Sequence, residues 1–282
     1  MGRYIKWTEK KILELSKEGR GTGTGADYKP WLDVRSFSSL GRSRRVFSPK
    51  TGRVHHLFSD IEYRLFIALE WQQDIVDIRE QYPLDRELTQ TIASRLGVRH
   101  PYYPGTHVPT VMTADMVVTR EVKGIACLEA FNAKSQAEAE DKNSMEKLEI
   151  QRIYFQSQDI RHHLVFDSLI PRQRVKNIDW IRDSIPKGHE TERFEGYWAS
   201  MEAKMLTSLH HVQHDNRSLV DFCSAFDAEQ GAEKGTGIRA ARILMSRRLL
   251  RVDLAAPDIP ALPVWHFSTT QVPTLGPTSG SH

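Results

Sequence analysis

Apolar residues recur at helical spacing in three stretches of the first half of the chain. Residues 59–71 carry them three and four positions apart, at Ile61, Leu65, Phe66 and Leu69, which predicts a helix with one buried face. Residues 144–158 show similar spacing after Ser144, a favourable N-cap. A short helix is also predicted between Thr8, another favourable N-cap, and Gly19, which can end it.

Short apolar runs typical of β-strands lie between and after these helices. They occur at residues 73–81, 113–119, 125–133 and 162–167. The order is therefore helix, three strands, helix, strand. Because a strand that returns to its own sheet through a helix makes a crossover connection, we expect an α/β fold with a mixed sheet flanked by helices.

The second half of the chain has a different pattern, which follows a helix expected to end near Ile185. Pro186 and Gly188 interrupt the chain there and mark a domain boundary. Helices are then predicted over 192–209, 218–230 and from the turn at 231–237 to about 248, followed by a β-ribbon of 249–254 and 264–267. The expected domains are 1–185, 186–270, which is mostly helical and winged-helix-like, and a disordered tail, 271–282.

The composition excludes several classes of protein. A chain of 282 residues with 39% hydrophobic residues can form about two packed domains. It has no apolar run of the roughly 18 residues that a membrane span needs, and no signal-peptide pattern at its start. Two cysteines, Cys127 and Cys223, are too few for a disulfide framework or a cysteine-based zinc site. We therefore expect a cytoplasmic protein with no membrane partner.

Local charge gives more information than the net charge, which is only +3. Residues 34–58 contain no Asp or Glu. Basic side chains recur within this stretch at Arg42, Arg44, Arg45, Lys50 and Arg53. Such groups bind DNA phosphates largely without regard to sequence. The alternative is a solvated basic loop, and we favour DNA contact because the stretch lacks any acid.

Four polar residues lie where the predicted fold brings them to one edge of the sheet. Asn132 and Lys134 are two positions apart on one strand and share a face. Asp115 lies near the start of the preceding strand, and Glu62 lies on the helix at 59–71. Carboxylate oxygens suit magnesium or manganese, which lower the pKa of bound water, and a lysine can offset developing charge. The pattern indicates a metal site for phosphodiester hydrolysis.

Each of these residues also has a purely structural interpretation. Ser59-Asp-Ile-Glu62 is a capping box, in which Glu62 would only accept a hydrogen bond from the Ser59 backbone. Asp115 can be a solvated strand end, and Lys134 can be an exposed lysine that protects a sheet edge. Local sequence alone favours these interpretations, so the metal site depends on the wider pattern.

A series of short motifs runs through the first half in a fixed order. They are Glu18-Gly-Arg-Gly, Tyr28-Lys-Pro-Trp31, Gly41-Arg-Ser-Arg-Arg45, Lys50-Thr-Gly-Arg-Val-His-His56, Ser59-Asp-Ile-Glu62, Leu69-Glu-Trp71, Asp77-Ile-Arg-Glu-Gln-Tyr-Pro-Leu84, Thr113-Ala-Asp115, Lys134 and Met145-Glu-Lys-Leu-Glu149. The series resembles the TnsA-type endonuclease subunits of heteromeric (Tn-seven-like) transposases, whose catalytic domain is restriction-endonuclease-like. The second half resembles them mainly in the order of its elements and in Gly235-Thr-Gly-Ile-Arg239.

The resemblance implies magnesium-dependent cleavage of the 5′ ends of a transposon, with manganese able to substitute. An integrase-like transposase would cut and join the 3′ ends. Glu62, Asp115 and Lys134 would be catalytic, and Asp115, Glu62 and Asn132 would hold the metal. Family members more often carry Glu or Gln at the Asn132 position, so we expect weaker coordination there. Glu149 is interpreted as an exposed helix acid.

The implied partners are transposon-end DNA, the integrase-like transposase and an AAA-type regulatory ATPase, all in a bacterial cytoplasm. Basic residues of the C-terminal domain can contact DNA or the ATPase, and both remain open: Lys234, Arg239, Arg242, Arg247, Arg248 and Arg251. His210 and His214 have zinc-like spacing but lack the Glu of an HExxH motif. Two other functions remain, a free-standing restriction-like nuclease and a catalytically weak assembly subunit that bridges DNA and the ATPase.

Overall fold

The computed structural model describes residues 6–34, 42–187, 190–210 and 215–270. The chain divides into two compact units, Met1–Ile170 and Pro171–His282, which are described separately. The tail expected at 271–282 lies outside the described residues. No helix of the described part is long and apolar enough to cross a membrane.

The first unit is built on a four-stranded mixed sheet with the order β3-β4-β5-β6. β3 (Ile75–Pro83), β4 (Thr113–Val122) and β5 (Ile125–Lys134) are antiparallel neighbours. β6 (Arg161–Phe166) returns through a helix and pairs in parallel with β5. The predicted order of strands and the mixed sheet are therefore confirmed.

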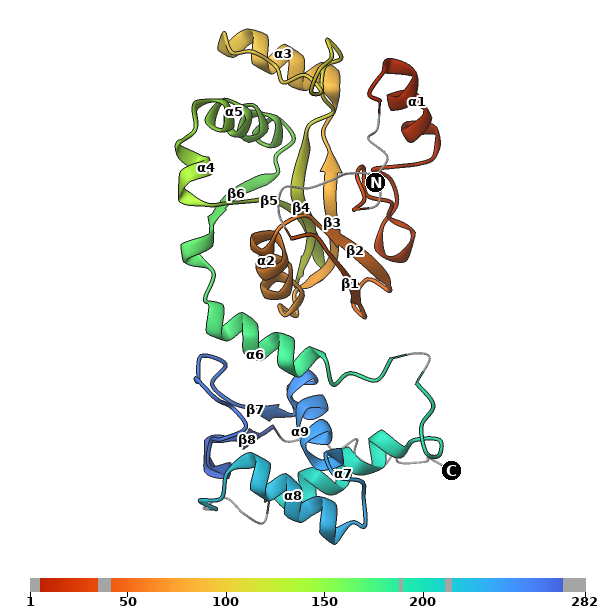
Figure 1. The fold of residues 1–282 in the computed structure, drawn as a ribbon, viewed down its shortest axis with the longest axis vertical. Helices are drawn as coiled ribbons and strands as arrows, with labels where there is room; N and C mark the ends of the chain where they lie inside the picture. Colours follow the sequence, from red (N-terminus) through yellow and green to blue (C-terminus); the bar gives the residue numbers. More distant parts are fainter. Residues whose placement is uncertain (1–5, 35–41, 188–189, 211–214, 271–282) are drawn as a thin grey trace, which may run out of the picture. The chain divides into compact units, whose positions relative to one another are not determined.

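Helices lie against this sheet (Figure 1), and their apolar side chains are buried there. α2 (Asp60–Glu70) packs against β5 and lies beside β2. α3 (Arg86–Leu96) and α5 (Lys142–Ser157) contribute Ile92, Ile150 and Phe155 to a core cluster that includes Val117 and Ala130 of the sheet. Burying each large side chain stabilises the fold by ~1.5–3 kcal/mol. α1 (Glu9–Lys17) begins after Thr8 as predicted.

Four local features of the first unit were not predicted. β1 (Arg44–Ser48) and β2 (Arg53–Leu57) form an antiparallel hairpin within the basic stretch. α3 precedes the proline-rich loop, and the short α4 (Gln136–Glu140) follows β5. α5 begins one turn before Ser144, because Asp141 is its N-cap and accepts a hydrogen bond from the Ser144 N–H.

In the described part of the second unit, three α-helices pack against one central helix, α9 (Thr236–Ser246). These are α6 (Arg172–Arg182), α7 (Tyr197–His210) and α8 (Leu219–Glu229). Ala240, Ala241 and Leu244 of α9 are fully buried at this centre. The predicted helices over 192–209 and 218–230 and the one ending near 248 are confirmed, with shifted ends.

Two expectations for the second half need correction. The boundary lies between Ile170 and Pro171 and not near 185, because α6 belongs to the second unit: the Asn177 amide donates to the carbonyl oxygens of Leu254 and Ala256. The predicted ribbon is a short pair, β7 (Leu250–Arg251) with β8 (Ser268–Thr269), and 264–266 is a 3₁₀-helix instead of a strand. The residues before β8 do not pair with β7, because Pro263 forms a bridge with Ser218 and the Val264 N–H donates to the Arg217 carbonyl.

Candidate active site

The antiparallel pairing of β4 and β5 brings the predicted site residues together. The start of β4 lies beside the end of β5, so Asp115 is next to Asn132 and Lys134. The backbone N–H of Ala133 donates to Asp115 Oδ2 over 2.7 Å and fixes the carboxylate at the sheet edge. Asp115 is therefore held by the sheet, and the interpretation as a solvated strand end is wrong.

Glu62 reaches the same place from the first turn of α2. Ser59 is the N-cap, and its Oγ accepts from the Glu62 N–H over 3.1 Å. The Glu62 carboxylate in turn accepts from the Phe58 N–H over 2.9 Å and from the Ser59 hydroxyl over 3.3 Å. Glu62 thus caps its helix in a variant of the predicted capping box. Its side chain is also buried close to Asp115 and is only 8% exposed.

The electrostatics of the site favour a cation. Burial, and secondly the Asp115 carboxylate, raise the pKa of Glu62 to about 8. Burial also raises the pKa of Asp115, although Lys134 and the Ala133 N–H oppose this shift. Asp115 raises the pKa of Lys134, aided by Glu138 and Glu62, so the lysine stays charged. Two desolvated carboxyl groups beside one ammonium form a site that a divalent cation would stabilise.

Asn132 is held by contacts on both ends of its amide. Its side chain is 2% exposed. Oδ1 lies 2.7 Å from Nε2 of His162 on β6, and the amide also hydrogen-bonds Asp115. Because Asp115 accepts hydrogen bonds, the amide N–H faces Asp115 and the oxygen accepts from the His162 N–H. These contacts orient the amide, and its oxygen keeps a second lone pair, so metal ligation by Asn132 stays a prediction.

A cleft of about 400 Å³ opens next to these residues. Asp115, Asn132 and Lys134 line it on the sheet side, and Ser144, Lys147 and Gln151 line it from α5. Gln151 was not predicted; it is buried, and its amide donates to the Thr113 carbonyl over 2.8 Å. Its signal in the sequence is a polar residue at helical spacing from Leu148 and Phe155, in the row that faces the core.

Two carboxylates are available as metal ligands at this site. Glu149 pairs with Arg152 over 2.7 Å and its side chain is 42% exposed, which confirms that it is an exposed helix acid. Within the described residues, no group of three or more His, Cys, Asp and Glu side chains could hold a metal ion. A metal ion at this site would therefore be bound by the carboxylates of Glu62 and Asp115. Oxygen atoms of the strands would have to complete its coordination.

The comparisons with known proteins agree with this geometry. The model of the TnsA-like endonuclease N-terminal domain matches residues 72–167, and the model of the TnsA endonuclease C-terminal domain matches residues 170–254. The transposition protein TnsA of transposon Tn7 from Escherichia coli is 34% identical over 249 residues, which cover 88% of this chain and 87% of the relative. The chain belongs to the TnsA family. It is an endonuclease subunit of a transposase.

The two TnsA domain matches meet close to the structural division. The first ends at 167 and the second begins at 170, which agrees with the division between Ile170 and Pro171. The site residues Asp115, Asn132 and Lys134 fall within the N-terminal match, whereas Glu62 precedes it. The candidate active site therefore lies in the endonuclease unit of this TnsA family member.

The basic stretch of this TnsA chain divides into exposed and buried parts. Arg42 and Arg45 are exposed. Arg44 is half-buried, pairs with Asp60 over 2.8 Å and lies over the ring of Tyr63. The Lys50 ammonium donates to the carbonyl oxygen of Ile75.

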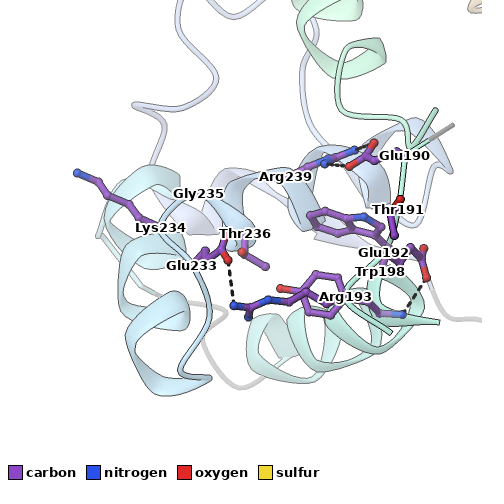
Figure 2. A pocket seen from close by; sticks show the side chains of 11 residues that line it. Glu190, Thr191, Glu192, Arg193, Trp198, Glu233, Lys234, Gly235, Thr236 and Arg239 are labelled. Atoms are coloured by element: carbon purple, nitrogen blue, oxygen red, sulfur yellow. Dashed lines mark hydrogen bonds and ion pairs between the residues drawn. The ribbon is translucent and has the colours of Figure 1, made fainter. Parts of the chain in front are cut away.

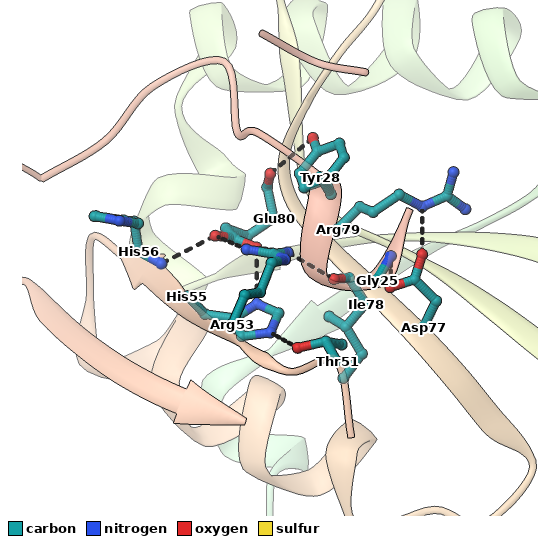
Figure 3. Close-up of polar contacts among 10 residues, drawn as sticks. All are labelled: Gly25, Tyr28, Thr51, Arg53, His55, His56, Asp77, Ile78, Arg79 and Glu80. Atoms are coloured by element: carbon teal, nitrogen blue, oxygen red, sulfur yellow. Dashed lines mark hydrogen bonds and ion pairs between the residues drawn. The ribbon is translucent and has the colours of Figure 1, made fainter. Parts of the chain in front are cut away.

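Arg53 is buried in a polar network that joins β2 to β3. Figure 3 shows Arg53, His55 and the backbone of His56 converging on the carboxylate of Glu80. His55 and Glu80 are fully buried, and the guanidinium of Arg53 also donates to the Ile78 carbonyl. Despite its burial, the pKa of Glu80 falls to about 2 through these hydrogen bonds. Lys50 and Arg53 are therefore structural residues, and the expected DNA contact by them is not supported.

The C-terminal arginines of this TnsA chain also have contacts within their own unit. Arg239 pairs with Glu190 and lies over the ring of Trp198, beside a pocket of about 300 Å³ at the start of α9 (Figure 2). Arg242 donates to the Trp180 carbonyl. Arg247 pairs with Glu202 over 2.8 Å. These contacts stabilise the helical unit, and Lys234, Arg247 and Arg251 are the exposed charges of the predicted cluster.

Proposed function

We propose that this TnsA family member is a magnesium-dependent DNA endonuclease that cleaves the 5′ ends of a transposon, while an integrase-like transposase cuts and joins the 3′ ends. The observation that carries the proposal is the convergence of Glu62, Asp115 and Lys134 at one sheet edge, beside an open cleft. Family membership supplies the class of reaction.

The residues of the site fit a hard divalent cation. Two carboxyl groups with raised pKa values, Glu62 and Asp115, are poorly solvated and gain most from a neutralising charge. Magnesium, or manganese in its place, would lower the pKa of a bound water and polarise the phosphate. Glu62 would hold such a cation as a carboxylate, and the Lys134 ammonium would offset charge that develops on the phosphate oxygens.

His162 and Asn132 serve this site as positioning residues. His162 fixes the Asn132 amide so that its N–H faces Asp115. Asp115 then receives hydrogen bonds from the amide and from Ala133, and its carboxylate keeps one orientation. A Glu or Gln at position 132 would reach further; the shorter Asn instead joins His162 to Asp115.

DNA and protein partners follow from the charges and from the family. Arg42 and Arg45 are exposed on or beside the β1–β2 hairpin and are suited to contact phosphates of transposon-end DNA. The C-terminal unit, a winged-helix-like domain in this proposal, would engage an AAA-type regulatory ATPase. The second candidate function is a catalytically weak assembly subunit, which the short side chain of Asn132, in the place of a longer Glu or Gln, favours.

The proposal is tested by cleavage of end-labelled transposon DNA in the presence of the element's other transposition proteins. Asp115→Asn keeps an acceptor for the Ala133 N–H but removes the charge, and Lys134→Ala removes the ammonium. Both should reduce 5′-strand cutting by about a hundredfold or more and leave 3′-strand cutting in place. Glu149→Gln, which neutralises an exposed acid on α5, is the matched control and should cut normally.

Three other results would redirect the assignment. Unchanged 5′ products from Lys134→Ala would support the assembly subunit. Strong cutting without any partner would support a free-standing nuclease. Loss of cutting in Glu149→Gln would show that the assay reports stability or assembly instead of the site.

A further inference from the structure

A groove extends from the catalytic residues over the proline-rich loop before β4. The cleft that contains Asp115 and Lys134 adjoins a second hollow of about 420 Å³. The two hollows share the residues Pro101, Tyr102, Tyr103, Pro104 and Lys147. The two hollows therefore form one continuous groove that leads away from the site.

The loop that forms the floor of this groove is fixed in place. Tyr103 is stacked on Trp7 with 3.8 Å between ring centroids, and its hydroxyl oxygen accepts from the Val111 N–H over 3.2 Å. Tyr102 forms a β-bridge with Pro109. Because these contacts hold the backbone on both sides of Tyr102, its ring is presented to solvent in a defined place.

Tyr102 has the exposure and neighbours of a stacking platform. Its side chain is 40% exposed although it is a large aromatic residue. The Arg99 guanidinium lies 5.3 Å from the ring centroid, and the exposed Lys147 lines both hollows. Among the described residues, no carboxylate forms an ion pair with Arg99 or Lys147. An aromatic face beside two cations suits a base together with its phosphate.

The volume of the groove fits a nucleotide. Hollows of about 400 Å³ and 420 Å³ each match a ligand of nucleotide size. A base can stack on the ring of Tyr102 only when it has left the DNA stack, because a paired base in a duplex presents its edges to a protein and not its face. The stacking contact therefore selects a strand with at least one unstacked base.

We propose that this groove binds an unpaired nucleotide of the strand that is cut, with Tyr102 stacked on its base and Lys147 at its phosphate. The proposal rests on the proposed function, because it places the nucleotide next to the scissile phosphate. It adds a requirement for local opening of the duplex at the transposon end, which costs a few kcal/mol and which stacking on Tyr102 would offset.

A short single-stranded oligodeoxynucleotide that contains 2-aminopurine tests this site on the full chain. EDTA prevents cleavage. The wild-type chain should quench the probe in a saturable manner. Tyr102→Phe keeps the ring and should behave like the wild type, whereas Tyr102→Leu should lose the quenching and bind about five- to a hundredfold more weakly. Lys147→Gln should weaken binding and lower its salt dependence, with quenching preserved at saturation.

Equal quenching and affinity for Tyr102→Leu and Tyr102→Phe would overturn the stacking. The stacking would also be overturned if a fully paired duplex bound as tightly as the single strand and its binding did not depend on Tyr102. The groove would then contact phosphates only. Absence of oligonucleotide binding by the wild type would exclude the site. If cleavage still depends on Lys134 in any of these cases, the groove fails while the proposed function stands.

Discussion

At the scale of single residues, Glu62 has two roles that conflict in the ion-free protein. Its backbone N–H and carboxylate both take part in the start of α2, yet burial and Asp115 raise its pKa to about 8. The folded protein therefore holds this proton more tightly than the unfolded chain, in which the ordinary value of 4.5 applies. The stability that protonated Glu62 contributes is complete below about pH 4.5 and is lost as the pH rises through about 8.

Thermal unfolding in EDTA checks this pH dependence. Between pH 6 and 9, the unfolding temperature of the wild type should fall more than that of Glu62→Gln, which has no charge to bury. Manganese in excess of the EDTA should restore the wild type at the high end of this range and have little effect on the variant. Parallel curves for the two proteins would show that Glu62 does not carry a raised pKa.

The hydrogen bond that His162 makes to Asn132 can be tested separately from the packing of its ring. His162→Gln can keep an N–H donor for the Asn132 oxygen, whereas His162→Leu cannot. We expect Leu to raise the manganese concentration for half-maximal cleavage several-fold and Gln to recover most of the loss. Equal effects of the two substitutions, or a change in unfolding temperature with unchanged metal dependence, would make His162 a packing residue only.

Some contacts of these residues could be predicted from the sequence and others could not. Asp115 and Lys134 were predictable because strand periodicity places them at the joined ends of two neighbouring strands. The partner of Asn132 was not, since His162 lies 30 residues later on a strand that reaches β5 only after α5. Pairing across a crossover connection is set by the fold and leaves no local pattern.

At the scale of elements, the β1–β2 hairpin explains why part of the basic stretch was misinterpreted. The buried positions of β2 are Arg53, His55 and Leu57, so its inward face lacks the apolar alternation by which strands are recognised. Glu80, which neutralises that face, lies on β3. A buried cationic strand and a solvated basic loop therefore have the same local sequence.

Substitutions on the two faces of this hairpin should have opposite consequences. Arg53→Ala leaves the Glu80 carboxylate buried without its main partner and should cost about 3–5 kcal/mol in urea unfolding. Arg45→Ala, on the exposed face of the neighbouring strand, should change the free energy of unfolding by less than about 0.5 kcal/mol and should weaken DNA binding at low salt. A stable Arg53→Ala protein that loses only DNA affinity would restore the surface interpretation.

At the scale of the whole molecule, the position of the division determines which fragments can fold. α6 buries Val175, Ile178 and Ile181, packs on α9, and is tied to the carbonyl oxygens of Leu254 and Ala256 by Asn177. The sequence placed α6 in the first domain because Pro186 and Gly188 are strong breakers, but breakers mark a loop and do not show which core a helix joins.

Two pairs of fragments distinguish these boundaries. Residues 171–282 should unfold cooperatively, and residues 186–282, which lack α6, should be much less stable, because the buried face of α9 loses its cover. Likewise, the fragment of residues 1–170 should remain soluble. The fragment of residues 1–185 should expose the apolar side of α6 to solvent. Circular dichroism during heating provides the comparison. A more stable 186–282 fragment would favour the boundary near 185.

The central claim is that Asp115 and Glu62 hold the divalent cation of this endonuclease. Calorimetric titration of manganese into the full chain, with a short DNA duplex present, tests it most directly. Wild type and Glu149→Gln should both show saturable binding, and Asp115→Asn should abolish it without changing the far-ultraviolet circular dichroism. Equal manganese binding by Asp115→Asn and wild type would contradict the claim, because the cation would then lie elsewhere in the protein.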